Sequence, residues 1–154
     1  MPARTADRNV ASAACACGRL RRATRALTQF YDDAMAPAGL HLTQFSLLRT
    51  LARSGPARIS DLAATALLDR TALSRNLEPL VARGLVAVIT GRDARTREVS
   101  LTRAGTRAIR DAEPYWKRAQ ADVARRLGAP KLGALIATLA EIETLHPATT
   151  GRDD

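Results

Sequence analysis

The stretch "ISDLAATALLDRTALSRNLEPLVARGLV", residues 59–86, decides the fold of this chain. Apolar residues recur at three- and four-residue spacing on both sides of Asp69, which predicts two short helices joined with almost no linker. We expect Ser60 and Asp69 to cap these helices, because a side-chain oxygen at a helix start accepts hydrogen bonds from otherwise unpaired amides. Two helices at this distance are typical of a helix-turn-helix.

The second helix of this pair has one apolar face and one polar face. Its apolar face carries Leu73, Leu77, Leu80 and Val81. Its polar face carries Arg70, Thr71, Ser74, Arg75 and Glu78. The guanidinium group of arginine can form paired hydrogen bonds with guanine bases and with phosphates. The short hydroxyl side chains of threonine and serine can also reach bases and phosphates. We therefore interpret the polar face as a surface that reads DNA.

Pro79 lies inside this second helix and has no amide hydrogen to donate to the carbonyl of Arg75. The helical spacing of apolar residues nevertheless continues through "LVARGLV". We predict a kinked helix that continues toward Gly84, rather than one that stops at the proline.

After Gly84 the pattern changes from helical to extended. Apolar and polar residues alternate in "EVSLT" (98–102), "LVAVIT" (85–90) is a short apolar run, and the "GRDARTR" between them (91–97) is charged. The pattern predicts a β-hairpin beside the helix-turn-helix, as in a winged helix. Its tip carries Arg92, Asp93, Arg95 and Arg97.

The segments on either side are predicted to be helical. One helix is expected over 10–36, another over "QFSLLRTLARSG" (44–55) with Thr43 as its cap, and two more over 102–127 and 130–146. The expected fold class is mainly α with a small β-hairpin wing. We interpret the chain as a single domain (1–154) with a winged helix-turn-helix at 43–102, between helical regions at 10–36 and 103–146.

Composition and charge agree with a helical DNA-binding domain. The chain has 154 residues, of which 46% are hydrophobic but only 3% aromatic, which favours a helical core of Leu, Ala, Val and Ile. The net charge of +9 is confined to residues 1–57 and 58–107, whereas residues 108–154 are balanced. This asymmetry indicates a polyanionic partner. Together with the polar face of the second helix, it leads us to expect double-stranded DNA. A GC-rich genome would also favour arginine, but it does not explain the asymmetry.

These residues resemble the MarR (multiple-antibiotic-resistance regulator) family of bacterial transcription factors over roughly residues 12–146. The most specific part is Asp93-x-Arg95 followed by Val99-x-Leu101-Thr102-x-x-Gly105, preceded by "DRTALSRNL" (69–77). The resemblance implies a homodimer whose first and last helices, in 10–36 and 103–146, intertwine. Two winged units would then bind a pseudo-palindromic operator, usually to repress transcription. The broad apolar face of the last helix also needs a partner surface.

The expected DNA contacts follow from this arrangement. The major groove would receive Arg70, Thr71, Ser74 and Arg75. Arg95 would enter the minor groove, flanked by Arg92, Asp93 and Arg97. The alternative for each arginine is a solvated surface position. The alternative for the whole protein is a nucleoid-like architectural protein that binds DNA without sequence preference.

Both cysteines of the chain lie in "CACGRLRRATRALTQFY" (15–31). On a continuous helix Cys15 and Cys17 point about 200° apart, so they do not bind one metal ion. Cys17 lies at the edge of the apolar stripe and four residues before Arg21, whose guanidinium favours a reactive thiolate. Cys17 is therefore the better candidate for an oxidant sensor, and Cys15 the weaker one.

The same stretch is similar to the first helix of the organic-hydroperoxide-resistance regulators within the family. The similarity implies that Cys17 is reactive and that Tyr31 bonds its sulfur. It is partial, because Leu42 replaces a second tyrosine and no later cysteine follows to resolve a sulfenic acid. Two alternatives stay open. Cys17 is a small packing residue, or the signal is a small anionic or aromatic ligand whose carboxylate pairs with Arg21, Arg25 or Arg49.

Other classes of function lack a sequence signal. The chain has no Gly-rich phosphate loop, paired-Cys zinc pattern or HExxH, and its histidines, His41 and His146, have no nucleophile at catalytic spacing. We predict no enzymatic activity, no metal and no cofactor. No apolar run approaches the roughly 18 residues of a membrane span. We expect a cytoplasmic protein with reduced cysteines and no contact with membranes.

Overall fold

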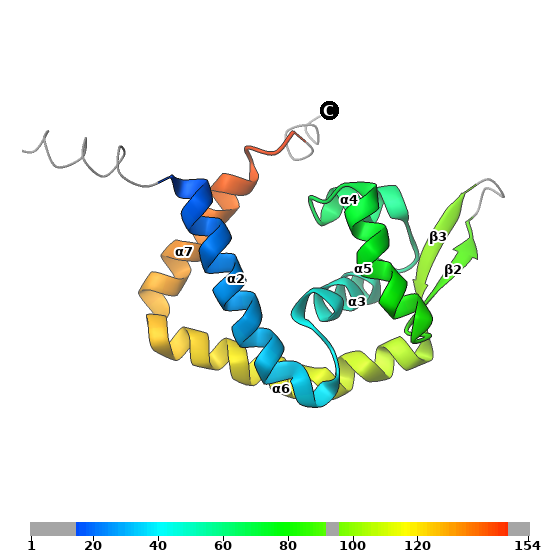
Figure 1. The fold of residues 1–154 in the computed structure, drawn as a ribbon, viewed down its shortest axis with the longest axis horizontal. Coiled ribbons are helices and arrows are strands. Elements are labelled where there is room, and N and C mark those ends of the chain that lie inside the picture. The colour runs from blue at the N-terminus through cyan, green and yellow to red at the C-terminus, as the bar shows by residue number, and fades with distance from the viewer. Residues whose placement is uncertain (1–14, 92–95, 148–154) are drawn as a thin grey trace, which may run out of the picture.

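The computed structural model describes residues 15–91 and 96–147 (Figure 1). Helix α6 (Arg103–Leu127) runs along the base of the molecule and carries a group of elements on each half. The winged helix-turn-helix stands over its N-terminal half, and helices α2 and α7 stand over its C-terminal half. Because α6 contacts α2, α3 and α7, it joins the two groups in one fold. None of the helices in these two ranges is both long and apolar enough to cross a membrane.

The N-terminal part of the described chain consists of α2 (Ala16–Met35), the 3-10 turn η1 (Ala36–Ala38) and α3 (Leu42–Ser54). The end predicted for the first helix is correct to within one residue, whereas its predicted start at Val10 lies outside the described residues. The prediction of Thr43 as the cap of α3 is wrong. The Asp32 carboxylate instead accepts the first amide of α3, that of Leu42, at 2.6 Å. A side chain of α2 therefore caps α3.

The central stretch forms β1 (Ala57–Arg58), α4 (Ile59–Thr65) and α5 (Arg70–Ala82). The cap at Asp69 is confirmed, since its Oδ1 accepts the amide of Ala72 at 2.7 Å. The cap predicted at Ser60 is wrong, because β1 pairs with β3 and runs directly into α4, which leaves Ser60 inside the first turn. Pro79 lies within α5, and the helix continues past it as predicted.

The wing is an antiparallel hairpin of β2 (Val86–Thr90) and β3 (Arg97–Leu101). Val88 pairs with Val99, and Thr90 pairs with Arg97 at the end of the hairpin nearest its tip. The short strand β1 pairs with the other edge of β3, which gives the order β1-β3-β2. The sequence pattern does not predict β1, because two residues are too few to show alternation. The mainly helical fold with a small β wing is confirmed.

Helix α7 (Ala129–Glu143) follows α6 and has no fully buried side chain, although Leu132 is half-buried against residues of α2 and α6. Both C-terminal helices agree with the prediction, although α7 ends at Glu143 rather than at His146. Its apolar residues are open to solvent, with Ile136 55% exposed and Leu145, just beyond the helix, 82% exposed. An uncovered apolar surface of this kind marks an interaction site.

The main core lies inside the winged helix-turn-helix and reaches α6. Its fully buried side chains include Phe45, Leu48 and Leu51 of α3, Leu73 and Leu80 of α5, and Val99 of β3. The prediction of Val81 in this core is wrong, because Val81 is 42% exposed on the flank of α5 that faces the wing. A smaller cluster of Tyr31, Ala119 and Val123 joins α2 to α6.

Thr102 connects the end of α5, the wing and α6 through hydrogen bonds. Its hydroxyl donates to the Gly84 carbonyl at 2.7 Å, and its amide donates to the Leu85 carbonyl at 3.2 Å. The same hydroxyl oxygen accepts the amide of Gly105 at 3.0 Å, which caps α6. These bonds draw the first turn of α6 against the backbone of Leu85.

The replacement Gly105→Ala is expected to lower the free energy of unfolding by about 2 kcal/mol, because overpacking against a rigid neighbour costs roughly 1–3 kcal/mol. A Cβ at residue 105 would lie 2.1 Å from the Leu85 carbonyl oxygen, which is backbone and cannot rotate away. Urea unfolding followed by circular dichroism measures the change. The matched control is Gly18→Ala in α2, whose added Cβ meets Cys15 Cβ at an ordinary 3.8 Å. Unchanged stability of the Gly105 variant would contradict this close contact.

Candidate nucleic-acid interface

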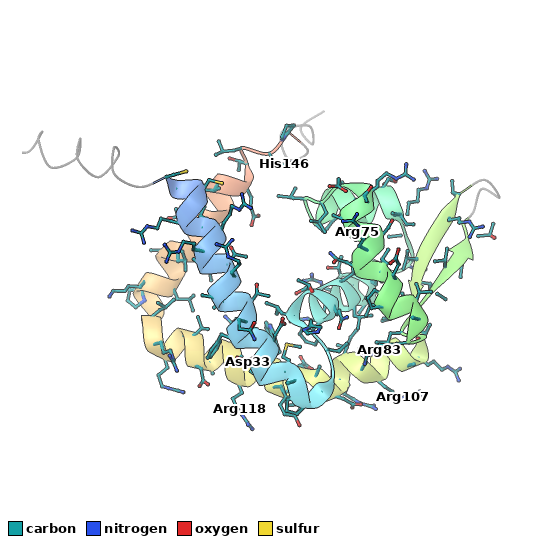
Figure 2. The ribbon with its side chains drawn as sticks, in the orientation of Figure 1. Asp33, Arg75, Arg83, Arg107, Arg118 and His146 are labelled. Carbon is teal, nitrogen blue, oxygen red and sulfur yellow. The ribbon has the colours of Figure 1, made fainter. Side chains whose placement is uncertain are left out.

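Helix α5 presents one face to solvent because its other face is buried. Leu73, Leu77 and Leu80 face the core. The exposed residues of the helix include Arg70, Thr71, Arg75, Asn76 and Glu78. The Asp69 cap holds the first turn, so the exposed side chains project from a regular helix from its start. Arg75 projects from the N-terminal half of α5, and Arg83 lies at its C-terminal end (Figure 2).

Ser74 differs from its predicted neighbours because it is half-buried. Its hydroxyl donates to the Arg70 carbonyl at 2.8 Å, so its proton is used inside the helix and its oxygen is left as an acceptor. Ser74 also borders a hollow of about 340 Å³ between α5 and the wing, together with Val81 and Val88. It therefore lies where the helix surface meets the wing.

The wing contributes Arg97, which is exposed at the first position of β3. The Gly91 amide donates to the Thr96 carbonyl at 2.8 Å and closes the hairpin below its tip. Arg92, Asp93 and Arg95 lie outside the described residues, so their predicted positions rest on the sequence.

Among the described residues, no carboxylate neutralises Arg70, Arg75 or Arg97. None of the ion pairs between described residues involves Arg70, Arg75 or Arg97. Those ion pairs lie along α6 or join α2 to the residue before α3. Free guanidinium groups on an exposed helix and an adjacent hairpin produce a positive potential that attracts phosphates.

Sequence analysis did not include two polar residues of this region, Asn76 and Arg58. Asn76 directly follows Arg75 and is exposed on α5, and a helical projection that allowed a wider polar face would have included it. Arg58 is exposed on β1 and is paired in register with Glu98 of β3. Its position depends on a strand of two residues, which has no pattern in the sequence.

The two cysteines lie at the start of α2, and both are exposed. Cys17 is in the first turn, whereas Cys15 precedes the helix with a non-helical ψ of 116°. The 200° separation expected on a continuous helix therefore does not apply to Cys15. Because Cys17 is exposed, it is not a packing residue within one chain. Across the described residues, no group of three His, Cys, Asp or Glu side chains is arranged to hold a metal ion.

Cys17 and Arg21 line the same hollow, of about 610 Å³, between the start of α2 and the end of α7. Its other lining residues include Leu20, Arg25, Ile142 and Leu145. Arg49, the third arginine considered for a ligand carboxylate, lies elsewhere on α3, with its guanidinium 4.5 Å from the ring centre of Trp116 in α6. Arg21 and Arg25 therefore share one hollow, whereas Arg49 lies at a different site beside Trp116.

Tyr31 packs against α6 and donates its hydroxyl to the side chain of Gln120. Burial raises the pKa of the Tyr31 phenol above its ordinary value of 10.0. Tyr31 and Cys17 are fourteen residues apart on one helix, or about 21 Å at 1.5 Å per residue. The sulfur contact implied by the hydroperoxide regulators is therefore impossible within one chain and requires a second subunit.

Comparison with known proteins places this geometry in a family. A sequence model of the MarR family matches residues 38–96. The transcriptional regulator MosR of M. tuberculosis, solved in complex with DNA, is 41% identical, with 86% of this chain and 98% of that chain covered and a TM-score of 0.75. This chain belongs to the MarR family. It is a DNA-binding transcriptional regulator, not an enzyme.

Other similar solved structures are more distant in sequence. The transcriptional repressor CouR, bound to p-coumaroyl-CoA, is 25% identical, with 84% of this chain and 91% of that chain covered and a TM-score of 0.73. A mutant of E. coli MarR complexed with operator DNA has the same fold at 21% identity, with coverages of 81% and 91% and a TM-score of 0.74. No curated protein matches the chain.

The Asp69→Ala replacement is expected to lower the free energy of unfolding by about 1 kcal/mol, because it leaves the Ala72 amide of α5 without its acceptor. Asp69→Asn keeps a side-chain oxygen at this position and serves as the matched control, with little expected change. Thermal or urea unfolding of both variants measures the difference. Equal losses in the two variants would show that the carboxylate charge, and not the capping bond, stabilises the helix.

Proposed function

We propose that this MarR-family regulator is a homodimer that binds a pseudo-palindromic operator and represses transcription until a signal releases it. The observation that carries the proposal is the exposed face of α5 beside the wing, which presents Arg70, Thr71 and Arg75. Neither of these arginines forms an ion pair with a described residue. A helix with this surface fits the major groove. The structure of MosR in complex with DNA supports a DNA-binding role for this fold.

We assign base recognition chiefly to Arg75. It projects from the exposed face of α5, and arginine bonds guanine O6 and N7 with two parallel hydrogen bonds. Arg70 and Thr71 lie in the first turn and would contact phosphates or bases at the groove edge. Ser74 would act only as an acceptor, because its proton is bonded to the Arg70 carbonyl.

We assign the minor groove to the wing. Arg95 would enter the groove, and Arg92, Asp93 and Arg97 would position it or contact the adjacent phosphates. The exposed position of Arg97 at the start of β3 supports this assignment.

The proposed dimer would cover the apolar surfaces that one chain leaves open. Helix α7 has no fully buried side chain, and Leu27 of α2 is 44% exposed. A second copy would bury both helices and place two α5 helices on one side of the DNA. The balanced charge of residues 108–154 supports a role for the C-terminal helices away from DNA.

Two routes of release remain as proposals. In the first, a small anionic or aromatic ligand binds near the dimer helices, which the CouR complex with p-coumaroyl-CoA supports. In the second, the Cys17 thiolate attacks an organic hydroperoxide, so that the O–O bond breaks, an alcohol leaves and a sulfenic acid forms. The exposure of Cys17 in one hollow with Arg21 supports the second route. Tyr31 of a second subunit would then be the nearest analogue of the tyrosine in the hydroperoxide regulators.

A selection from random duplexes with the purified protein is expected to return paired inverted half-sites, and DNase I protection of the selected sequence should have defined boundaries. Arg75→Ala should cost roughly 1–3 kcal/mol at the selected operator and relax preference at one base pair. Arg95→Ala should weaken binding to most sequences and reduce the salt dependence.

Arg118→Ala is the matched control, because Arg118 is an exposed arginine of α6 away from α5 (Figure 2). Its loss should leave operator preference unchanged. Protection without defined boundaries, equal on all sequences, would indicate an architectural protein and contradict the proposal.

Treatment with cumene hydroperoxide is expected to release wild-type protein from its selected operator in a gel shift. Cys17→Ser should stay bound under the same treatment, because it lacks the reacting thiolate. Cys15→Ser is the matched variant, and its release identifies Cys17 as the reacting residue. If the wild type stays bound, oxidation is not the signal, and a screen of small carboxylates tests the ligand route.

A further inference from the structure

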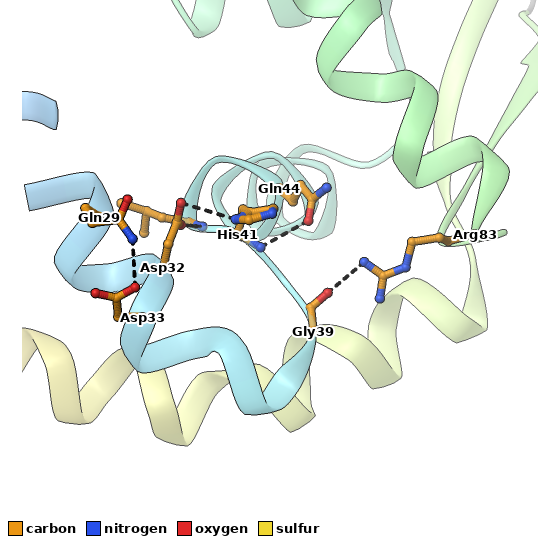
Figure 3. A network of polar contacts seen from close by, with 8 residues as sticks. Gln29, Asp32, Asp33, Gly39, His41, Gln44 and Arg83 are labelled. Atoms are coloured by element: carbon orange, nitrogen blue, oxygen red, sulfur yellow. Dashed lines mark hydrogen bonds and ion pairs between the residues drawn. The ribbon is translucent and has the colours of Figure 1, made fainter.

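The linker between α2 and α3 is held by polar contacts from two different helices (Figure 3). From α2, the Asp32 carboxylate accepts the Leu42 amide at 2.6 Å and lies 3.2 Å from His41 Nδ1. The Asp32 side chain is only 21% exposed, so these contacts are partly shielded from water. The His41 amide in turn donates to Gln44 Oε1 at 3.0 Å. Asp32 therefore fixes the point at which the chain enters the DNA-binding unit.

The second contact comes from the end of the helix proposed to read DNA. Arg83, the residue after α5, donates from Nη1 to the Gly39 carbonyl at 2.8 Å. Gly39 has a left-handed φ of 67°, the conformation in which η1 ends and the chain turns toward α3. The two residues are 44 positions apart in sequence, so this bond links separate elements.

These contacts connect the helix proposed to dimerise with the helix proposed to read DNA. Asp32 holds residues 41 and 42 from α2, and Arg83 holds residue 39 from α5 (Figure 3). Between them, Leu40 is buried in the main core, as is Met35 at the end of α2. The linker is too short and too well anchored to absorb a change in the angle between the two helices. These contacts provide a physical connection between α2 and the C-terminal end of α5.

We propose that Arg83 and Asp32 are positioning residues that hold α5 at a set orientation to α2 and thereby determine which half-site spacing the dimer accepts. The inference rests on the proposed dimeric binding to an operator. In the proposed dimer the two α2 helices pack near the two-fold axis. The angle between α2 and α5 within each subunit then sets the distance between the two α5 helices. That separation must match a helical turn of DNA, about 34–36 Å.

Arg83 is not suited to reading DNA itself. It lies eight residues beyond Arg75, or about 12 Å along the helix, and its guanidinium is already bonded to the linker. Its hydrogen bond is exposed, so its loss should change global stability little. A positioning role for Arg83 predicts a changed preference for half-site spacing, whereas a phosphate contact predicts a changed salt dependence of binding.

The experiment uses the operator selected by the wild-type protein, the same operator with one base pair added or removed between half-sites, and a duplex with a single half-site. One base pair turns a half-site by roughly 35° about the DNA axis. For Arg83→Met, we expect the preference for the natural spacing over the altered spacings to fall by at least about threefold. Affinity for the single half-site and the salt slope should stay unchanged. Arg83→Lys, which keeps a donor, should restore part of the preference.

The matched control is Arg107→Met, which removes the same charge from an exposed position on α6 (Figure 2). It should leave the spacing preference as in the wild type. Asp32→Ala should reduce the preference as Arg83→Met does, whereas Asp32→Asn, which keeps a side-chain oxygen for the Leu42 amide, should retain most of it. If thermal unfolding shows that the alanine variant does not fold, the Arg83 variants carry the test. Asp32 and Arg83 do not bond each other, but both hold the same linker. The loss of spacing preference in the double variant should therefore be smaller than the sum of the losses in the two single variants.

Three results would overturn the inference. The first is a wild-type spacing preference in Arg83→Met. The second is a reduced salt slope in that variant, which would make Arg83 a phosphate contact. The third is an equal loss on every duplex, the single half-site included, which would make it a general stabiliser. If wild-type protein selects no paired half-sites, dimeric operator binding itself is rejected, and that result is visible before any variant is made.

Discussion

The burial of one face of α5 is the constraint on which the remaining structure depends. Leu73, Leu77 and Leu80 are buried in the main core, where α5 contacts α3, α4 and strand β2 of the wing. Each full burial of a leucine contributes roughly 1.5–3 kcal/mol. With three such anchors the helix cannot rotate about its axis. The arginines of the opposite face are therefore held outward, where no carboxylate of the described residues pairs with them.

Helix α6 extends this constraint to the rest of the molecule. At its start, Thr102 binds the carbonyls that follow α5, and Gly105 lies against the Leu85 backbone. Farther along, Ala119 and Val123 pack on Tyr31 of α2. A single helix of 25 residues thus contacts both the DNA-binding unit and the helices whose apolar residues remain open. Two connections therefore join α2 to the DNA-binding unit, one through α6 and one through the linker held by Asp32 and Arg83.

The parts of the fold that sequence analysis predicted correctly have local causes. The Asp69 cap, the hairpin and the continuation of α5 past Pro79 each depend on residues within a few positions of one another. The incorrect predictions have distant causes. Thr43 does not cap α3 because Asp32 of another helix supplies the acceptor, and Ser60 does not cap α4 because β1 is paired to β3. Val81 is exposed because the flank of α5 beside the wing is open to solvent.

The sequence by itself determined the helix-turn-helix, the wing, the arginine-bearing face of α5 and the family, because helical and strand periodicity and short motifs are local properties of the chain. Only the tertiary structure decided that Ser74 is half-buried, that Cys15 lies outside α2, and that Arg49 lies apart from Arg21 and Arg25. It also decided that Arg83 bonds Gly39, a partner 44 residues away. Contacts of this kind depend on how packed helices meet in space, and no spacing in the sequence encodes them.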